Sequence, residues 1–262
     1  MGLNMGFMDE NSVIVAGYGS PCILGIQVFF SLGLKPSQIS LLTHSADESN
    51  LPSWDFAKAN QIEVVDYKST SDELFLWVNK KKPSIIVSLH YRDRIPATVL
   101  NIPKYGGINL HPSLLPEYKG CFSIPWAIIN GEEKMGFTYH YMTEQFDKGN
   151  ILYQEEISIH NDDTSFSLFH KLIIKGINRL DLVLRKVIEE GSPGKKQENV
   201  GSYYPRKVPF DGYVNVEWDN TRIDRFVRSM YFPPHRGAMI NVGGREIELQ
   251  SMQDYIDIMD RK

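Results

Sequence analysis

The chain has 262 residues, a formal net charge of −4 and 42% hydrophobic residues, which suits one large globular domain and a smaller appendage. This charge balance gives no sign of nucleic acid or of an anionic membrane as a partner. No apolar run approaches the roughly 20 residues that span a bilayer, and residues 1–11 lack the long apolar segment of a secretory signal. Because only Cys22 and Cys121 are present, a disulfide framework is not expected, and we predict a cytoplasmic protein.

The first half of the chain alternates short apolar runs with segments of helical spacing. The runs are rich in β-branched residues and predict strands at 13–16, 39–43, 62–65, 85–89 and 107–110. Helices are expected between them at 22–32, 54–59 and 71–81. Such alternation is typical of an α/β fold, with a mostly parallel sheet and helices on both faces.

The second half continues with strands at 137–142 and 151–159, followed by a long amphipathic helix. We expect Asp162 or Asp163 to cap that helix, which ends at Gly191. Residues 192–202 are polar and contain glycine, which is typical of a linker. We therefore divide the chain into a catalytic domain at 1–200 and a small α+β region at 201–262. The latter is expected to hold a helix at 222–230 and a β-hairpin around Gly243-Gly244.

The segment from Gly107 to Pro116 carries the strongest chemical signal. Asn109 and His111 are two residues apart, so at the end of a strand their side chains point to the same side. Pro112 favours an extended backbone at His111, as in a strand that runs into a site loop. An amide, an imidazole and the later carboxylate of Asp147 can stabilise an oxyanion, move a proton and orient the imidazole.

This segment, with Asp147-Lys148-Gly149, resembles the formyltransferase family that uses 10-formyltetrahydrofolate, and bacterial sugar N-formyltransferases most closely. The Asn-x-His-Pro-Ser-Leu-Leu-Pro run and the downstream Asp-x-Gly carry the resemblance, which covers about residues 10–195 and, less clearly, the tail. It implies a Rossmann-like formyltransferase sheet and N10-formyltetrahydrofolate as formyl donor. It also implies catalytic roles for Asn109 as an oxyanion donor, His111 as a proton carrier and Asp147 as its orienting group.

The turn Gly17-Tyr18-Gly19 follows the first strand and invites comparison with dinucleotide-binding loops. The third glycine of that pattern would fall at Cys22, so the pattern is broken. A tight structural turn is one interpretation. A turn that faces a phosphate or sugar is the other, because a loop leading into a helix N-terminus favours anions. Under the second interpretation Tyr18 and Ser20 are substrate-binding candidates.

Two further segments supply candidates. By resemblance, residues 90–96 form the folate pocket, where Arg92 and Ile95 are chosen as cofactor-binding residues, although a solvated loop is equally compatible. Lys119 either contacts a substrate phosphate or is simply exposed. His140, on an alternating strand, is interpreted as structural. The seven histidines are scattered and form no metal-binding spacing, so no metal is expected.

The resemblance implies an enzyme that formylates the amine of a nucleotide-linked amino sugar, of the UDP- or dTDP-4-amino-4,6-dideoxysugar type. Residues 202–262 hold nine Lys and Arg and nine Asp and Glu, so this tail lacks the excess of positive charge expected of a tRNA-binding domain. Glycinamide ribonucleotide or methionyl-tRNA as acceptor, a folate-dependent hydrolase and a non-catalytic folate-binding relative remain as alternatives. A hairpin alone is marginal in water, so we expect the tail to join two subunits into a homodimer.

Overall fold

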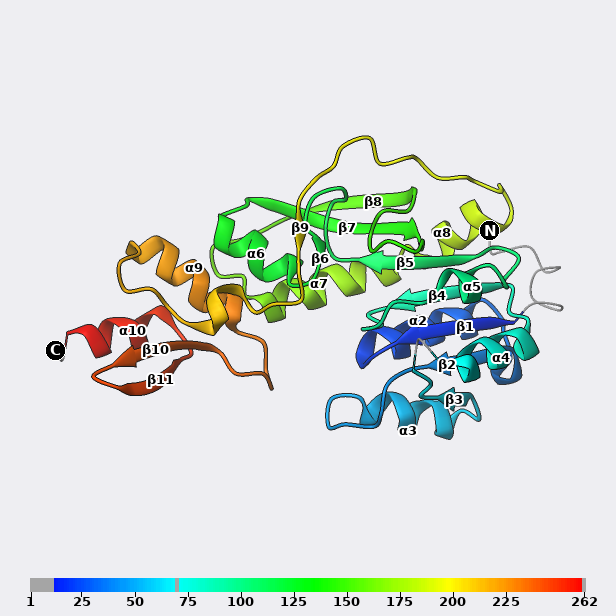
Figure 1. The fold of residues 1–262 in the computed structure, drawn as a ribbon, viewed down its shortest axis with the longest axis horizontal. Helices are drawn as coiled ribbons and strands as arrows, with labels where there is room; N and C mark the ends of the chain where they lie inside the picture. Colours follow the sequence, from blue (N-terminus) through cyan, green and yellow to red (C-terminus); the bar gives the residue numbers. More distant parts are fainter. Residues whose placement is uncertain (1–11, 69–70, 261–262) are drawn as a thin grey trace. The chain divides into compact units, whose positions relative to one another are not determined.

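The computed structural model describes residues 12–68 and 71–260 (Figure 1). Contacts group the chain into two units. Unit 1 comprises 1–111, 138–154 and 174–199, and unit 2 comprises 112–137, 155–173 and 200–262. The predicted boundary at residue 200 therefore divides the chain differently, because two segments of the expected catalytic domain group with the tail. Strands β7 (Lys134–Tyr141) and β8 (Ile151–Ser158) and helix α7 (Ser165–Ile177) run from one unit into the other.

The large sheet has seven strands in the order β3-β2-β1-β4-β5-β7-β8. Its first five strands are β1 (Val13–Gly17), β2 (Ile39–Leu42), β3 (Glu63–Val65), β4 (Ile85–Leu89) and β5 (Gly107–His111). These five pair in parallel, whereas β7 pairs with β5 in the antiparallel direction. The predicted mostly parallel α/β fold is confirmed, and every residue of the central strands β1, β2 and β4 is buried, as expected of a sheet covered on both faces.

Helices pack on each face of this sheet in unit 1. They are α2 (Ser20–Ser31), α3 (Leu51–Ala59), α4 (Asp72–Lys81), α5 (Ala97–Leu100) and α8 (Leu180–Ile188), with a 3₁₀ turn at Pro36–Gln38. Residues of α4 and α5 form one apolar cluster with Ile14, Ala16 and Leu42. On the other face α2 lies so close to β4 that a Cβ at Gly25 would come within 2.1 Å of the Leu89 side chain.

The long helix predicted after β8 is two helices. The helix α7 ends at Ile177 and α8 begins at Leu180, with the Arg179 N–H bonded to the Gly176 carbonyl at 2.9 Å. The predicted aspartate cap is also wrong, because Thr164 Oγ1 accepts from the Ser167 N–H at 3.1 Å. The Asp163 carboxylate instead accepts from the Lys171 ammonium, the Ser167 hydroxyl and the His160 N–H.

Unit 2 has its own core. It contains β6 (Lys119–Gly120), α6 (Ser123–Asn130), β9 (Tyr203–Tyr204), a 3₁₀ turn at Pro209–Gly212, α9 (Asn220–Met230), β10 (Ala238–Val242), β11 (Arg245–Leu249) and α10 (Met252–Met259). The strands β10 and β11 form the predicted antiparallel hairpin, turning at Gly243-Gly244. Its inner residues Ala238, Ile240 and Leu249 share a buried cluster with Ile129 of α6 and Phe226 of α9. The hairpin thus finds its apolar partner within the same chain.

No helix among the described residues is both long and apolar enough to cross a membrane.

Candidate active site

The predicted catalytic residues Asn109 and His111 lie where β5 pairs with β7. The antiparallel register sets Asn109 opposite His140 and His111 opposite Thr138. Directly opposed residues of an antiparallel pair project their side chains to the same face, so the imidazole of His140 joins Asn109 and His111. Since β5 is parallel to β4, Asn109 and His111 also lie at the carboxyl end of the parallel strands, where ligands bind in open α/β sheets.

The Asp147 carboxylate lies between two imidazoles. Its Oδ1 is 3.6 Å from His111 Nδ1 and 3.4 Å from His140 Nε2. All three side chains are at least nine-tenths buried. A buried carboxylate stabilises a positive charge that forms on an adjacent imidazole, because little water screens the pair. The structure therefore brings the predicted pair His111 and Asp147 together, with His140 as an additional member.

His140 orients the Asn109 amide. Its Nδ1 is 2.8 Å from the Tyr141 carbonyl oxygen, which can only accept, so Nδ1 carries the proton. In the neutral imidazole Nε2 then accepts from Asn109 Nδ2, at 3.1 Å. One N–H of the amide remains for a further acceptor. This leaves Asn109 as a donor of the type that stabilises an oxyanion.

The loop that carries Asp147 is tightly folded. Asp147 has φ 54°, in the left-handed region that few residues other than glycine and asparagine or aspartate adopt. A Cβ at Gly149 would lie 1.7 Å from the Tyr141 carbonyl oxygen, so only glycine allows this approach to the end of β7. The Asp-x-Gly spacing thus has a local steric cause. The resulting loop conformation directs the Asp147 carboxylate toward the two histidines.

A second polar cluster in unit 1 joins Tyr18 and Arg92. The guanidinium of Arg92 lies 3.4 Å from the centre of the Tyr18 ring, and the Tyr18 hydroxyl donates to Asp47 Oδ1 at 2.6 Å. Burial and this bond to Asp47 raise the pKa of the Tyr18 hydroxyl above its ordinary value, so the hydroxyl stays a donor. The Arg92 N–H donates to His44 Nε2 at 3.3 Å, and the His44 ring stacks on Tyr91. Tyr18, predicted to bind the substrate, and Arg92, predicted to bind the cofactor, are therefore neighbours.

The other candidates have varied surroundings. Ser20 is exposed at the start of α2, and Ile95 is buried in the apolar cluster beneath α4 and α5. In unit 2, Lys119 is 5% exposed and its ammonium donates to the Val200 carbonyl, so the interpretation as a simply exposed lysine is wrong. Gly17 supports the structural interpretation of the first turn, since a Cβ there would lie 2.4 Å from Cys22 Cβ.

Sequence reasoning missed His140 as part of the site and missed Asp47 as the partner of Tyr18. His140 lies on an alternating strand, but its register against Asn109 arises from pairing between residues 31 positions apart. The sequence signal that could have indicated it is the alternation of β7, which places His140 and Thr138 on the same face. No group of three or more His, Cys, Asp or Glu side chains among the described residues is arranged so that it could hold a metal ion.

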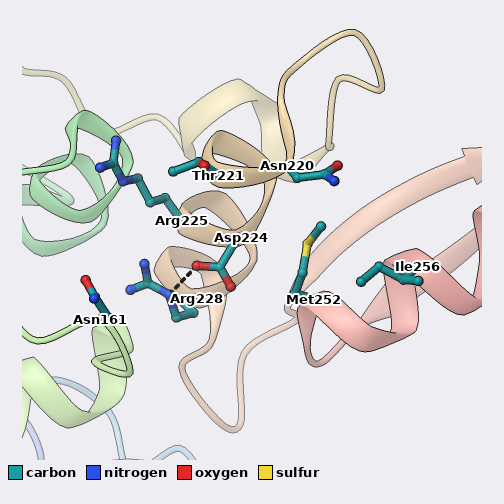
Figure 2. Close-up of a pocket in the computed structure, with 8 residues that line it drawn as sticks. All are labelled: Asn161, Asn220, Thr221, Asp224, Arg225, Arg228, Met252 and Ile256. Atoms are coloured by element: carbon teal, nitrogen blue, oxygen red, sulfur yellow. Dashed lines mark hydrogen bonds and ion pairs between the residues drawn. The ribbon is translucent and has the colours of Figure 1, made fainter.

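A separate pocket of about 480 Å³ lies within unit 2 (Figure 2). It is lined by side chains of α9 and α10 and by Asn161, and Arg228 there pairs with Asp224 at 2.8 Å. None of the predicted site residues lines it.

The order of the sheet and the cluster of Asn109, His111 and Asp147 at its carboxyl edge define a formyltransferase-type α/β protein. The chain belongs to the Formyl transferase family, whose model matches residues 42–180. Among its relatives is the GDP-perosamine N-formyltransferase of Brucella melitensis, which is 38% identical over 97% of this chain and 98% of its own length.

Solved structures share the fold. An N-formyltransferase from Helicobacter canadensis, in complex with folinic acid and dTDP-3-aminofucose, has a TM-score of 0.75 at 21% identity, over 92% of this chain and 87% of its own. A sugar N-formyltransferase from Shewanella has a TM-score of 0.73 at 19% identity, over 92% of this chain and 96% of its own. The similarity extends beyond the catalytic segment into the tail.

Proposed function

We propose that this protein transfers the formyl group of N10-formyltetrahydrofolate to the amine of a nucleotide-linked amino sugar. The observation that carries the proposal is the buried pair of His111 and Asp147, joined by the partly buried Asn109, at the carboxyl edge of the sheet. The relative that formylates a GDP-linked amino sugar matches over almost the full length of both chains, which supports the sugar as acceptor.

Each member of the cluster has a role in this reaction. The neutral amine attacks the formyl carbon, and the carbonyl oxygen gains negative charge. Asn109 donates its free N–H to that oxygen, an interaction of a kind that is worth roughly 2.7–4 kcal/mol in a transition state. His111 takes the proton that the amine loses, or relays it to the departing nitrogen, and Asp147 stabilises the resulting imidazolium. Asp147 also positions a water in the transfer path.

The residues after β4 suit the formyl donor, which supplies an activated one-carbon electrophile. Tyr91 presents a buried hydroxyl with no hydrogen-bond partner among the described residues, and such a group is expected to meet a polar ligand atom. The half-buried Arg92 adds a positive charge suited to the glutamyl carboxylates of a folate. We assign Arg92 and the backbone near Ile95 to the donor, and Tyr18 and Ser20 to the acceptor.

The acceptor is a nucleoside diphosphate sugar with a primary amine. The relative's name makes a GDP-linked sugar the first candidate, beside the UDP- and dTDP-linked sugars predicted from the sequence. Lys119 is retained as a phosphate-binding candidate because its buried ammonium donates to the Val200 carbonyl and has the capacity to donate two further hydrogen bonds.

We further propose that the protein is cytoplasmic and forms a homodimer through its C-terminal region. The support for a dimer is a set of exposed apolar side chains in unit 2: Val208, Phe210, Val216 and Ile256. The balanced charge of the tail, with nine residues of each sign in 202–262, gives no electrostatic barrier to self-association.

The test is incubation with N10-formyltetrahydrofolate and a panel of GDP-, UDP- and dTDP-linked amino sugars, followed by mass spectrometry. We expect one formyl group on one or a few of these sugars and tetrahydrofolate in equal amount. Release of formate without a formylated product would support a hydrolase instead. Donor binding without turnover on any acceptor would support a non-catalytic relative.

A further inference from the structure

The segment 192–197, expected to be a linker, is tied along the loop that carries Asp147. Ile151 and Lys195 exchange two backbone hydrogen bonds, with N···O distances of 2.8 and 2.7 Å. The Tyr141 hydroxyl donates to the Ser192 carbonyl at 2.7 Å, and Asn150 Nδ2 donates to the Pro193 carbonyl at 2.9 Å. We call residues 192–197 the strap. Its contacts fall on both ends of the loop between β7 and β8.

Gln197 makes the strap's closest contact with the catalytic loop. Its Nε2 donates to the Asp147 carbonyl and to the Gly149 carbonyl, both at 2.8 Å. The two acceptors fix the orientation of the amide, because the opposite orientation would place Oε1 against two carbonyl oxygens. Gln197 Oε1 is buried and has no hydrogen-bond partner among the described residues. The side chain is therefore held by its donors alone.

The backbone that Gln197 holds sets the direction of a catalytic carboxylate. Asp147 is in the left-handed region, a conformation that persists only when surrounding contacts maintain it. The Asp147 carboxylate lies 3.6 Å from His111 Nδ1 and 3.4 Å from His140 Nε2, so a small rotation of the peptide would move it away from one imidazole or both.

We propose that Gln197 is a positioning residue for the Asp147 carboxylate. Its two donated hydrogen bonds clamp the peptide groups that follow Asp147 and Gly149 and keep the carboxylate between His111 and His140. The effect of Gln197 on kcat rests on the proposed function, whereas its effect on the position of the Asp147 carboxylate does not. A merely structural strap would change the stability of the protein and leave the catalytic step unaltered.

The test uses the full-length protein with Gln197→Met, which keeps the length of the side chain and removes both donors. The matched control is Glu198→Met, at the exposed next position. We expect Q197M to lower kcat about 10- to 100-fold, as for a misplaced catalytic group, without raising the KM of donor or acceptor. E198M should retain the wild-type kcat. A second variant, Gln197→Asn, is too short to reach both carbonyls and should lower kcat as well.

The second readout needs no substrate. The ring-nitrogen NMR shifts of His111 and His140 report the hydrogen bonds and charge around each imidazole. We expect both to move in ligand-free Q197M or Q197N and to stay in place in E198M. A folded Q197M or Q197N with a wild-type kcat or with unmoved ring-nitrogen shifts would overturn the proposal, even if its melting temperature falls. If the wild-type protein formylates no sugar of the panel, the proposed function fails, and the shifts still decide the role of Gln197.

Discussion

At the scale of single residues, the chemistry depends on which nitrogen atoms of one amide and two imidazoles carry a hydrogen, and on which of them face the Asp147 carboxylate. His140 cannot use Nδ1 for catalysis, because that atom donates to the Tyr141 carbonyl. His111 has its Nδ1 directed at Asp147, and its Nε2 is thus the atom able to exchange a proton with substrate. The two histidines therefore have different roles, one orienting Asn109 and the other carrying the proton.

Replacing His111 with Asn should leave the fold intact and lower turnover by about 10²–10⁴-fold, the usual contribution of a positioned acid–base group. Asparagine is polar and smaller, so it fits the buried position without adding a charge. Single-turnover kinetics with saturating donor measures the effect directly. A rate near that of the wild type would remove His111 from the mechanism.

Asp147→Asn is nearly isosteric and should keep the shape of the loop, but it removes the charge that stabilises an imidazolium. We therefore expect a large loss of kcat with donor affinity close to the wild-type value. Calorimetric titration with folinic acid measures that affinity. Weaker donor binding as the main defect would assign Asp147 to binding instead.

At the scale of elements, loops and helix ends position the site and stabilise each unit. The loop between β7 and β8 is shaped by Asp147 and Gly149 and held by the strap. In unit 2, the start of α7 is held by Asp163, whose carboxylate is 2% exposed and paired with Lys171. Burial would raise the pKa of Asp163, but hydrogen bonds from Lys171, the His160 N–H and Ser167 outweigh it and lower the pKa.

The sign of the pH dependence follows from that lowered pKa. The Asp163 carboxylate contributes fully to stability above the unfolded carboxyl pKa of about 3.9, and the contribution is lost as pH falls through the lower folded value. Asp163→Asn should therefore lower the free energy of unfolding by about 1.5–3 kcal/mol at pH 7, as for hydrogen bonds to a charged group. The difference from the wild type should shrink as pH decreases below about 4.

Denaturant unfolding at several pH values measures this effect. The control is Glu156→Gln, which breaks the exposed pair of Glu156 with Lys134 and should change stability by less than about 1 kcal/mol. If the free energy of unfolding differs between Asp163→Asn and the wild type by the same amount at every acid pH, the charge of Asp163 contributes nothing to stability.

At the scale of the whole molecule, the hairpin of the tail was expected to need a second subunit, but it packs against other segments of unit 2. The hairpin buries its inner face in unit 2, against α6 and α9, so it does not need a second subunit to be stable. Truncation after Ser202 would expose Ile129 of α6, and it cannot test a dimer cleanly. The case for a dimer now depends on the exposed apolar side chains of unit 2.

We expect the full-length protein to be a dimer at micromolar concentration in light scattering. The double change Val208→Glu and Val216→Glu should shift it toward monomer, because it places charges among those exposed apolar side chains. Leu76→Glu, at a 62% exposed position of α4 in unit 1, is the matched control and should remain dimeric. A monomeric wild-type protein would exclude the proposed homodimer.

Much of the fold and part of the site could be predicted from the sequence. The strands 13–16, 39–43 and 85–89 were located closely, because buried parallel strands have a continuous β-branched composition that is readable locally. Asn109 and His111 could be paired from a spacing of two along one strand. The division of the long helix at Asn178 was missed because the apolar spacing continues across it, and the cap was misplaced because Asp163 and Thr164 are adjacent residues that both favour N-cap positions.

By itself, the sequence determined the alternation of strands and helices, the pair of Asn109 and His111 on one strand and the hairpin of the tail, because each is read from residues a few positions apart, and Asp147 was added through the family resemblance. Only the tertiary structure decided which groups surround those residues. His140 meets Asn109 through the register of β7 on β5, Gln197 reaches the Asp147 loop across 50 residues, and Lys119 is buried beneath Val200 rather than exposed. Strand register and the path of a returning segment arise from packing over long sequence separations, which local patterns do not specify.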